Sequence, residues 1–125
     1  MKKIATIALM LIALPNAALA EGDAKKGKKV FKKCRSCHSL EAGKNGIGPS
    51  LNGIIGKAAG TAEGYDNYST ALVESGITWS EEELRKFVTS PTEKIPGTKM
   101  SFGGLKREKD KDNLLAYLIS NSHSE

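Results

Sequence analysis

The sequence predicts a small all-α domain, and three observations carry this prediction. Apolar residues recur at helical spacing after Asp23, after Ser80 and again before Asn121. The two long stretches between these helices, residues 39–61 and 91–105, are rich in glycine and proline and offer few strand candidates. The whole chain has 125 residues, which is enough for one domain and little more.

The N-terminal residues have the features of a secretory signal peptide. A positive start precedes an apolar run at residues 4–14, and Ala18-Leu19-Ala20 supplies a small-residue cleavage site. The run is short for a membrane span, and an uncleaved N-terminal anchor is the alternative. We therefore predict a signal peptide at 1–20, one domain at 21–125, a periplasmic location and no stable membrane insertion after cleavage.

The first helix should run from Ala24 to about Cys34, with Asp23 as its N-cap. Gly27 in its middle costs about 1 kcal/mol relative to alanine, which we expect another helix to offset by approaching closely. The exposed face carries a run of lysines, namely Lys25, Lys26, Lys28, Lys29, Lys32 and Lys33. We interpret the first four of these as a solvated face.

The last helix should run from about Arg107 to Asn121. Its apolar stripe consists of Leu114, Leu115, Tyr117 and Leu118. This stripe is a suitable partner for the glycine-containing face of the first helix.

Two shorter helices should lie between these. Residues 69–74 favour a short helix that ends at Gly76, and an extended segment follows at 77–79. Ser80 and Glu83 have the spacing of a capping box, which opens a helix that stops at Ser90-Pro91.

The most informative motif is Cys34-Arg35-Ser36-Cys37-His38. C-x-x-C-H is the pattern of covalent c-type haem attachment, in which each thiol adds to one vinyl group and the histidine ligates the iron. A thiol–disulfide oxidoreductase is an alternative, but it requires a preceding strand in a βαβ pattern. A structural zinc site is a third interpretation, and it lacks a fourth ligand at a plausible spacing.

Met100 is the candidate for the sixth iron position. It is the only methionine of residues 21–125 and lies in a loop flanked by proline and glycine. A thioether is a soft ligand that raises the reduction potential relative to a second histidine. The alternatives are that Met100 fills a gap in the core, or that the iron is open as in a haem enzyme or gas-binding protein. His123 lies in a polar C-terminal tail and is not a ligand candidate.

At this point the chain resembles the class I c-type cytochromes, close to the mitochondrial cytochrome c and bacterial cytochrome c2 group. The resemblance extends from Gly22 to Leu118. Besides the haem motif, it includes Gly48-Pro49-Ser50-Leu51, Gly76-Ile77-Thr78-Trp79 and Ile95-Pro96-Gly97-Thr98-Lys99-Met100. It implies a fold in which the N- and C-terminal helices cross and long loops wrap around one covalent haem c.

The resemblance also implies roles for individual residues around the haem. The Pro49 carbonyl should accept a hydrogen bond from the ring of His38, which fixes the imidazole tautomer. Further contacts are implied for Tyr68 and Trp79 with one propionate, for Thr98 with the other, and for Phe102 at the haem edge beside Met100. Trp79 can also be interpreted simply as a core aromatic.

Two positions depart from the pattern of these cytochromes. Lys57 stands where an arginine is usual, and lysine lacks the rigid fork that pairs with a propionate. Phe87 stands where a tyrosine is usual, so one hydrogen bond to the Met100 sulfur should be absent.

These features predict a soluble periplasmic single-electron carrier that is not an enzyme. A quinol–cytochrome c reductase is the expected donor, and a terminal oxidase, peroxidase or photosynthetic reaction centre the expected acceptor. A basic ring should steer acidic partners to the haem edge, and its candidates are Lys32, Lys33, Lys44, Lys57, Lys94 and Lys99. The net charge of +5 is mild, so we expect no nucleic-acid partner, and we expect a monomer.

Overall fold

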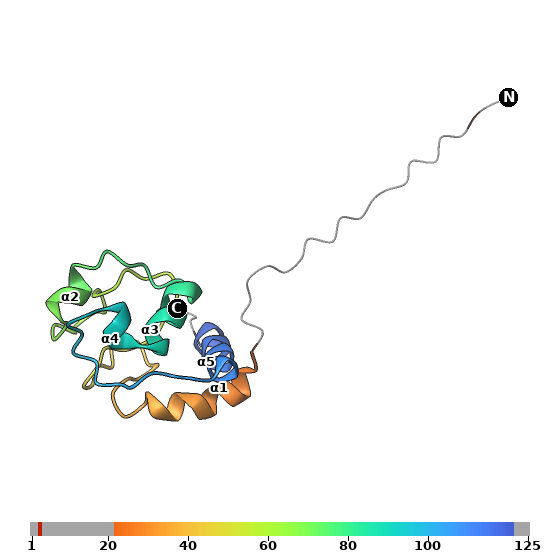
Figure 1. Ribbon diagram of the computed structural model, residues 1–125, viewed down its shortest axis with the longest axis horizontal. Coiled ribbons are helices and arrows are strands. Elements are labelled where there is room, and N and C mark those ends of the chain that lie inside the picture. The colour runs from red at the N-terminus through yellow and green to blue at the C-terminus, as the bar shows by residue number, and fades with distance from the viewer. Residues whose placement is uncertain (1–2, 4–21, 122–125) are drawn as a thin grey trace.

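The computed structural model describes Lys3 and residues 22–121. Its helices are α1 (Ala24–Val30) with the 3₁₀ turn η1 (Phe31–Lys33), α2 (Thr70–Val73), α3 (Glu81–Thr89), α4 (Pro91–Lys94) and α5 (Glu108–Ser120). Long loops join these helices (Figure 1). Within the described residues, the only β pairing is one isolated bridge, so the predicted all-α class is confirmed. Apart from Lys3, the predicted signal peptide lies outside the described residues, as does His123.

The first helix is set by its N-cap. The Asp23 carboxylate accepts hydrogen bonds from the backbone N–H groups of Lys25, at 2.8 Å, and Lys26, at 3.2 Å. The α-helix ends at Val30, and its last turn tightens into η1, with Cys34 as the C-cap. The helical segment therefore ends at the predicted place, but its last turn is 3₁₀ instead of α-helical.

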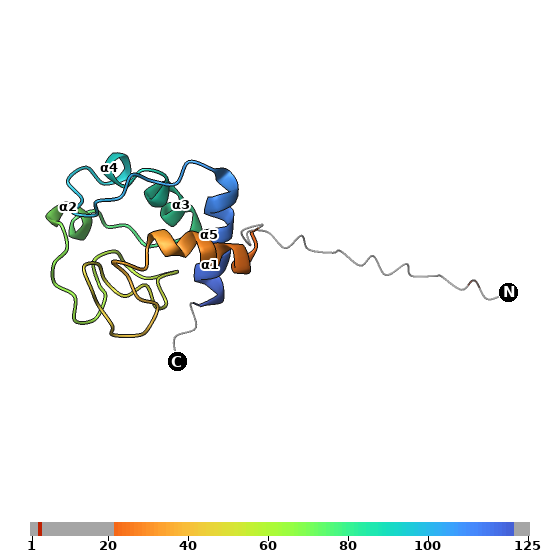
Figure 2. The ribbon, with the colours of Figure 1, turned by 90° about the horizontal axis from the view of Figure 1, so that it is seen from below.

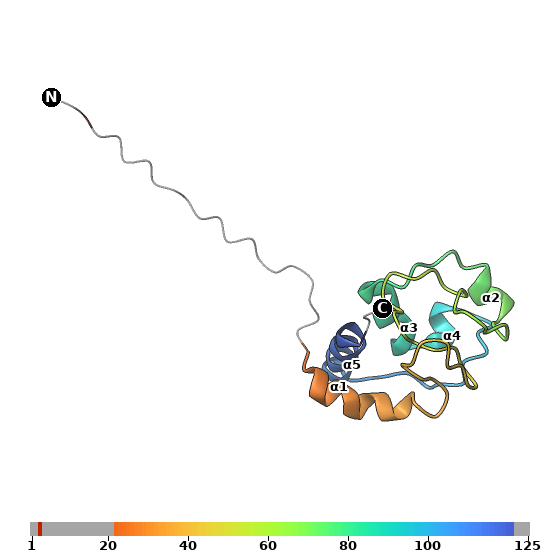
Figure 3. The same ribbon diagram turned by 180° about the vertical axis from the view of Figure 1, so that it is seen from behind.

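The crossing of α1 over α5 is confirmed (Figures 1 and 2). A Cβ atom on Gly27 would overlap the backbone carbonyl oxygen of Asn113 and would lie 2.6 Å from the Cβ of Tyr117. The backbones meet there because glycine has no side chain. Phe31 packs on Tyr117 with ring centroids 5.5 Å apart. The view from behind shows the same pair of helices in contact (Figure 3).

The predicted capping box of α3 is only half formed. The Ser80 hydroxyl accepts a hydrogen bond from the Glu83 N–H at 3.1 Å, as expected for an N-cap. The reciprocal bond, in which the Ser80 N–H would donate to the Glu83 carboxylate, does not form, because that carboxylate pairs with Lys94 at 2.6 Å. The Ser80 N–H instead donates to the Thr78 carbonyl at 2.8 Å.

The interpretation of residues 91–105 as loop missed the one-turn helix α4. Pro91 occupies its first turn, where its missing N–H costs nothing. The rest of this stretch, which we call the Met100 segment (residues 95–105), is anchored at both ends. Ile95 is buried at one end, and at the other Leu105 is 1% exposed and donates its N–H to the Val88 carbonyl at 2.8 Å.

The core consists of two apolar clusters that share α3 and α5. One contains Ala59, Trp79, Leu84, Phe87, Ile95 and Leu115. The other contains Phe31, Val88, Leu105, Leu114 and Leu118. In Figure 2 the loop between η1 and α2 lies on one side of the molecule, and α3 and α4 lie on the other. Among the helices of the described part, none is long and apolar enough to cross a membrane.

Candidate functional site

One cavity of about 350 Å³ brings all the predicted site residues together. Its size is within the range of small-molecule and cofactor sites. The segment that follows η1 supplies Cys34, Cys37 and His38, and the Met100 segment supplies Met100. The other predicted residues that line it are Pro49, Tyr68, Trp79, Thr98 and Phe102. Residues that are far apart in the sequence thus face a common interior space.

The two thiols are held by a tight turn after η1. The N–H of Cys37 donates to the Cys34 carbonyl at 3.1 Å, and the N–H of His38 donates to the same oxygen at 2.9 Å. No disulfide joins Cys34 and Cys37. Burial, helped by Cys37 and opposed by Lys33, raises the pKa of Cys34 to about 11. Because redox-active cysteines need a depressed pKa, this site does not suit a thiol–disulfide oxidoreductase.

The imidazole of His38 is fixed in one tautomer. Its Nδ1 lies 2.7 Å from the Pro49 carbonyl oxygen. A carbonyl oxygen only accepts, so Nδ1 carries the proton and Nε2 keeps its lone pair. Burial lowers the pKa of His38, against the opposing effect of the Pro49 bond, which keeps the ring neutral at neutral pH. A neutral imidazole with a free Nε2 is the form that binds a metal.

Gly48 packs directly against the imidazole of His38. A Cβ atom at this position would lie 2.7 Å from Nδ1 and 2.9 Å from Nε2 of His38, well inside van der Waals distance. Only glycine leaves room for the ring. The sequence contains this glycine within the Gly48-Pro49 motif, but its contact with the ring depends on how the loop folds.

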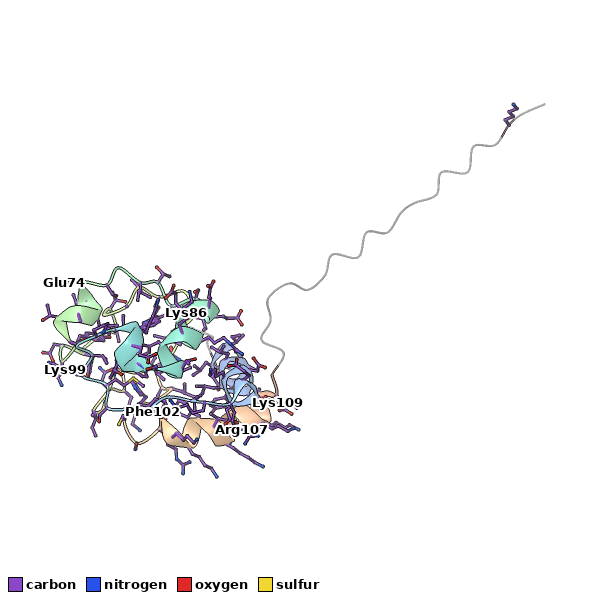
Figure 4. All side chains as sticks on the ribbon, in the orientation of Figure 1. Glu74, Lys86, Lys99, Phe102, Arg107 and Lys109 are labelled. Carbon is purple, nitrogen blue, oxygen red and sulfur yellow. The ribbon has the colours of Figure 1, made fainter. Side chains whose placement is uncertain are left out.

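Met100 is half-buried and packs against the cluster that contains Trp79. Its N–H donates to the Thr98 hydroxyl oxygen at 3.2 Å. The neighbouring Lys99 donates from Nζ to the Asn67 side-chain oxygen at 3.0 Å, which links the Met100 segment to the loop before α2. Sequence reasoning missed Asn67, since nothing in a polar loop marks a residue as the partner of a distant lysine. Lys99 and Phe102 both lie along the Met100 segment (Figure 4).

Two polar groups in the wall can donate into the cavity. The Tyr68 hydroxyl oxygen accepts the N–H of Ala62 at 2.9 Å, which leaves its own proton free to donate. Burial raises the pKa of Tyr68, so the phenol stays protonated. Trp79 is 5% exposed and packs on Phe87 at 5.1 Å. The hydrogen bonds found among residues 22–121 include no acceptor for its indole N–H.

The charged residues in the cavity wall are all basic. They are Lys33, Lys57 and Lys99, and no carboxylate from the described part of the chain lines the cavity. Lys57 is fixed at the wall because its Nζ donates to the Asn52 carbonyl oxygen at 2.9 Å. The cavity is apolar and presents cations, free hydrogen-bond donors, two thiols, an imidazole and a thioether. These groups fit a large apolar molecule that carries carboxylates, and they fit haem c.

Two lysines of the predicted basic ring form ion pairs within the protein. Lys94 pairs with Glu83, and its side chain is only 23% exposed. Lys94 is therefore a weaker candidate for the ring, because its charge is compensated on the protein. Lys44 pairs with Glu41 at 3.6 Å on an exposed surface, where such a pair contributes little.

The zinc interpretation finds no support within the described residues. Their His, Cys, Asp and Glu side chains form no group of three or more that could hold a metal ion. A structural zinc site needs four such ligands in a closed tetrahedron.

Comparison with known proteins decides the family. The family model described as Cytochrome c matches residues 24–122. The chain belongs to the cytochrome c family. It is 52% identical over 98 residues to cytochrome c2 of Rhodoblastus acidophilus, an alignment that covers 78% of this chain and 91% of that protein. It is also 47% identical over 102 residues to cytochrome c of Gibberella zeae, covering 80% of this chain and 95% of that protein.

A solved structure agrees with this assignment. Cytochrome cH from Methylobacterium extorquens superposes with a TM-score of 0.74 at 44% sequence identity, covering 79% of this chain and 99% of that chain. The predicted resemblance to class I c-type cytochromes is thereby confirmed, together with their fold. Family membership means that the chain carries covalent haem c, for which Cys34 and Cys37 have the attachment spacing. The chain is a haem c electron carrier.

Proposed function

We propose that the chain is a soluble periplasmic carrier of single electrons, processed after Ala20, whose working domain is residues 21–125. It takes electrons from a quinol–cytochrome c reductase and delivers them to a terminal oxidase, a peroxidase or a photosynthetic reaction centre. One observation carries the proposal: His38 Nε2 and Met100 line the same carboxylate-free cavity as the two thiols. Two neutral ligands suit an iron that changes its charge without changing its ligands.

The predicted site residues of the wall have separate roles in this proposal. Cys34 and Cys37 would hold the haem through thioether bonds, and His38 and Met100 would bind its iron. Bound haem supplies the Fe(II)/Fe(III) couple. The carbonyl of Pro49 holds the imidazole in its metal-binding tautomer through the 2.7 Å contact.

The remaining wall residues orient the group and exclude water. Tyr68 and Trp79 each have a free donor that suits one propionate, and Thr98 suits the other. Phe102 is half-buried against the second core cluster and closes the edge beside Met100. A dry, fixed ligand set leaves no site for a substrate, so we propose that the protein is not an enzyme.

Charge supports the choice of partner. The cations of the cavity wall, Lys33, Lys57 and Lys99, are exposed on their outer side, and Lys32 is exposed beside them. A surface of one sign attracts a partner of the opposite sign and raises the rate of encounter at low salt. We therefore propose partners with acidic docking surfaces, which bind a monomer of this chain.

A haem enzyme or gas-binding protein with an open iron is the rival proposal. Such a site needs a distal acid or base. Among residues 22–121, those that line the cavity include no carboxylate and no second imidazole. The geometry therefore favours the electron carrier.

The experiment distinguishes two roles of Met100, an iron ligand and a side chain that only fills the core. Met100→Leu keeps the apolar volume but removes the sulfur, so packing survives and ligation does not. We expect this variant to bind cyanide more readily in the oxidised state and to have a lower reduction potential. Cyanide affinity and potential that match the wild-type values would contradict the proposed role of Met100.

A further inference from the structure

The ion pair between Glu83 and Lys94 joins α3 to α4. These two helices lie side by side (Figures 1 and 2). Glu83 is in the first turn of α3, Lys94 is the last residue of α4, and 2.6 Å separates the Lys94 Nζ from the Glu83 Oε2. Among the ion pairs between residues that the structure describes, no other reaches α4. The rest lie in a loop, within one helix, or between α3 and α5.

The Glu83–Lys94 pair is better shielded from water than an ordinary surface ion pair. The side chains are 29% exposed for Glu83 and 23% for Lys94, whereas Glu82 and Lys86, which pair within α3, are 76% and 53% exposed. The Glu83 Oε2 itself is buried. Exposed pairs contribute little because water and salt screen them, and partly buried pairs are screened much less. This pair therefore has the geometry of a contact that holds α4 in place.

Lys94 stands directly before the Met100 segment. The next residue, Ile95, is 4% exposed, so the start of the segment is packed into the core beside α4. The far end is fixed to α3 by the hydrogen bond from the Leu105 N–H to the Val88 carbonyl at 2.8 Å. Both ends of the segment are thus attached to α3, one through the backbone and the other through the ion pair. Fixing both ends reduces the entropy that the chain loses when Met100 binds a metal.

We propose that Glu83 and Lys94 are positioning residues for the Met100 ligand. Their ion pair holds α4 against α3, and α4 in turn holds the Met100 segment at the cavity wall. Without the pair, α4 separates from α3 more often, and Met100 leaves the iron more often. This inference rests on the proposed function, because it requires Met100 to be the sixth ligand.

An ion pair that only stabilises the fold would act differently. Its loss would lower the free energy of unfolding but would leave Met100 on the iron in every molecule that remains folded. The two roles are separated by a measurement of local opening in the folded, oxidised, haem-loaded protein. Cyanide is the probe, because it binds the oxidised iron only after Met100 has left it. The rate of cyanide binding therefore reports how often the Met100 segment opens.

The experiment is a double-mutant cycle with Glu83→Gln, Lys94→Gln and the combination of the two. Asp112→Asn is the matched control, because its side chain is 31% exposed and pairs with Arg85 of α3 at 2.7 Å, but lies on α5. Lys94→Arg keeps the charge and is the conservative variant. The iron–methionine absorption band, the reduction potential and unfolding in denaturant are measured for every protein.

We expect each single glutamine variant to bind cyanide about 5- to 30-fold faster than the wild type at neutral pH. Each should also have a lower reduction potential, because a thioether that is bound less firmly favours reduced iron less. The double variant should match the single variants, since loss of the second partner breaks no further contact. Asp112→Asn and Lys94→Arg should stay within about twofold of the wild-type rate.

Three results would overturn the proposal. The first is a wild-type cyanide rate in both single glutamine variants. The second is an equal acceleration in Asp112→Asn, because any loss of stability would then open the site. The third is a double variant in which the two accelerations multiply, because the two side chains would then act independently.

Failure of the proposed function has a different signature. In the three cases above, the iron–methionine band of the oxidised wild type would still support ligation by Met100. If the oxidised wild type lacks that band, Met100 is not the ligand, and the proposed ligand set and this inference fail together.

Discussion

Gly48→Ala should damage the haem site by moving the imidazole of His38. The added Cβ would lie 2.4 Å from Cε1 and 2.7 Å from Nδ1, so the ring has to retreat by roughly 1 Å to reach ordinary contact distance. That movement stretches the 2.7 Å bond from Nδ1 to the Pro49 carbonyl beyond hydrogen-bond range. The variant tests whether Gly48 and its loop hold the His38 imidazole in the position from which it is proposed to bind iron.

The expected loss of unfolding free energy in Gly48→Ala has two contributions. Loss of the hydrogen bond costs about 1 kcal/mol, and overpacking a rigid site costs about 1–3 kcal/mol. A total of roughly 2–4 kcal/mol should lower the melting temperature of a domain of this size by roughly 10–20 °C.

The assay is thermal unfolding of the haem-loaded protein by circular dichroism, with the reduction potential as a second readout. Gly103→Ala is the control, because a Cβ there meets nothing within 4 Å. Its stability should stay within about 0.5 kcal/mol of the wild type. If Gly48→Ala has the same melting temperature as Gly103→Ala and the wild-type reduction potential, then Gly48 does not hold the His38 imidazole in place.

Two further variants test the packing and the electrostatics. Gly27→Ala should destabilise the protein by about 1–3 kcal/mol in denaturant unfolding, because the added methyl group overlaps the Asn113 carbonyl oxygen and forces α1 away from α5. Helix propensity alone predicts the opposite, so a variant more stable than the wild type would contradict the close crossing of the two helices. The hydrogen-bonded ammonium of Lys94 holds the pKa of Glu83 below its ordinary value of 4.5. The Glu83–Lys94 ion pair therefore stabilises the folded protein fully above pH 4.5, and this stabilisation is lost as the pH falls through the lower pKa of the folded state. Unfolding measured from pH 7 to pH 3 should therefore show that the wild-type protein is more stable than Glu83→Gln, by a difference in unfolding free energy that shrinks below pH 5. A difference that stays constant with pH would exclude the ion pair as its cause.

The long helices and the haem motif were predictable from the sequence because their signals are local. The spacing of apolar residues around Gly27 and Leu114 depends on helical periodicity alone. The cysteine and histidine spacing of residues 34–38 follows from the geometry of the group they bind. The choice of Met100, the only methionine of residues 21–125, needed only the loop context and the haem motif upstream.

The parts that sequence reasoning missed depend on contacts between distant segments. The sequence predicts that α3 stops at Ser90-Pro91, but it does not show that Pro91 also begins α4. The capping box failed because Lys94, brought close by α4, competes for the Glu83 carboxylate.

The most direct test of the account is a visible absorption spectrum of the purified, exported protein, first oxidised and then reduced. The account predicts sharp low-spin c-type bands after reduction and the weak long-wavelength iron–methionine band in the oxidised state. A high-spin spectrum would contradict ligation by Met100 and would favour an open iron. A spectrum without haem bands, from cells with the maturation machinery, would contradict the haem site itself.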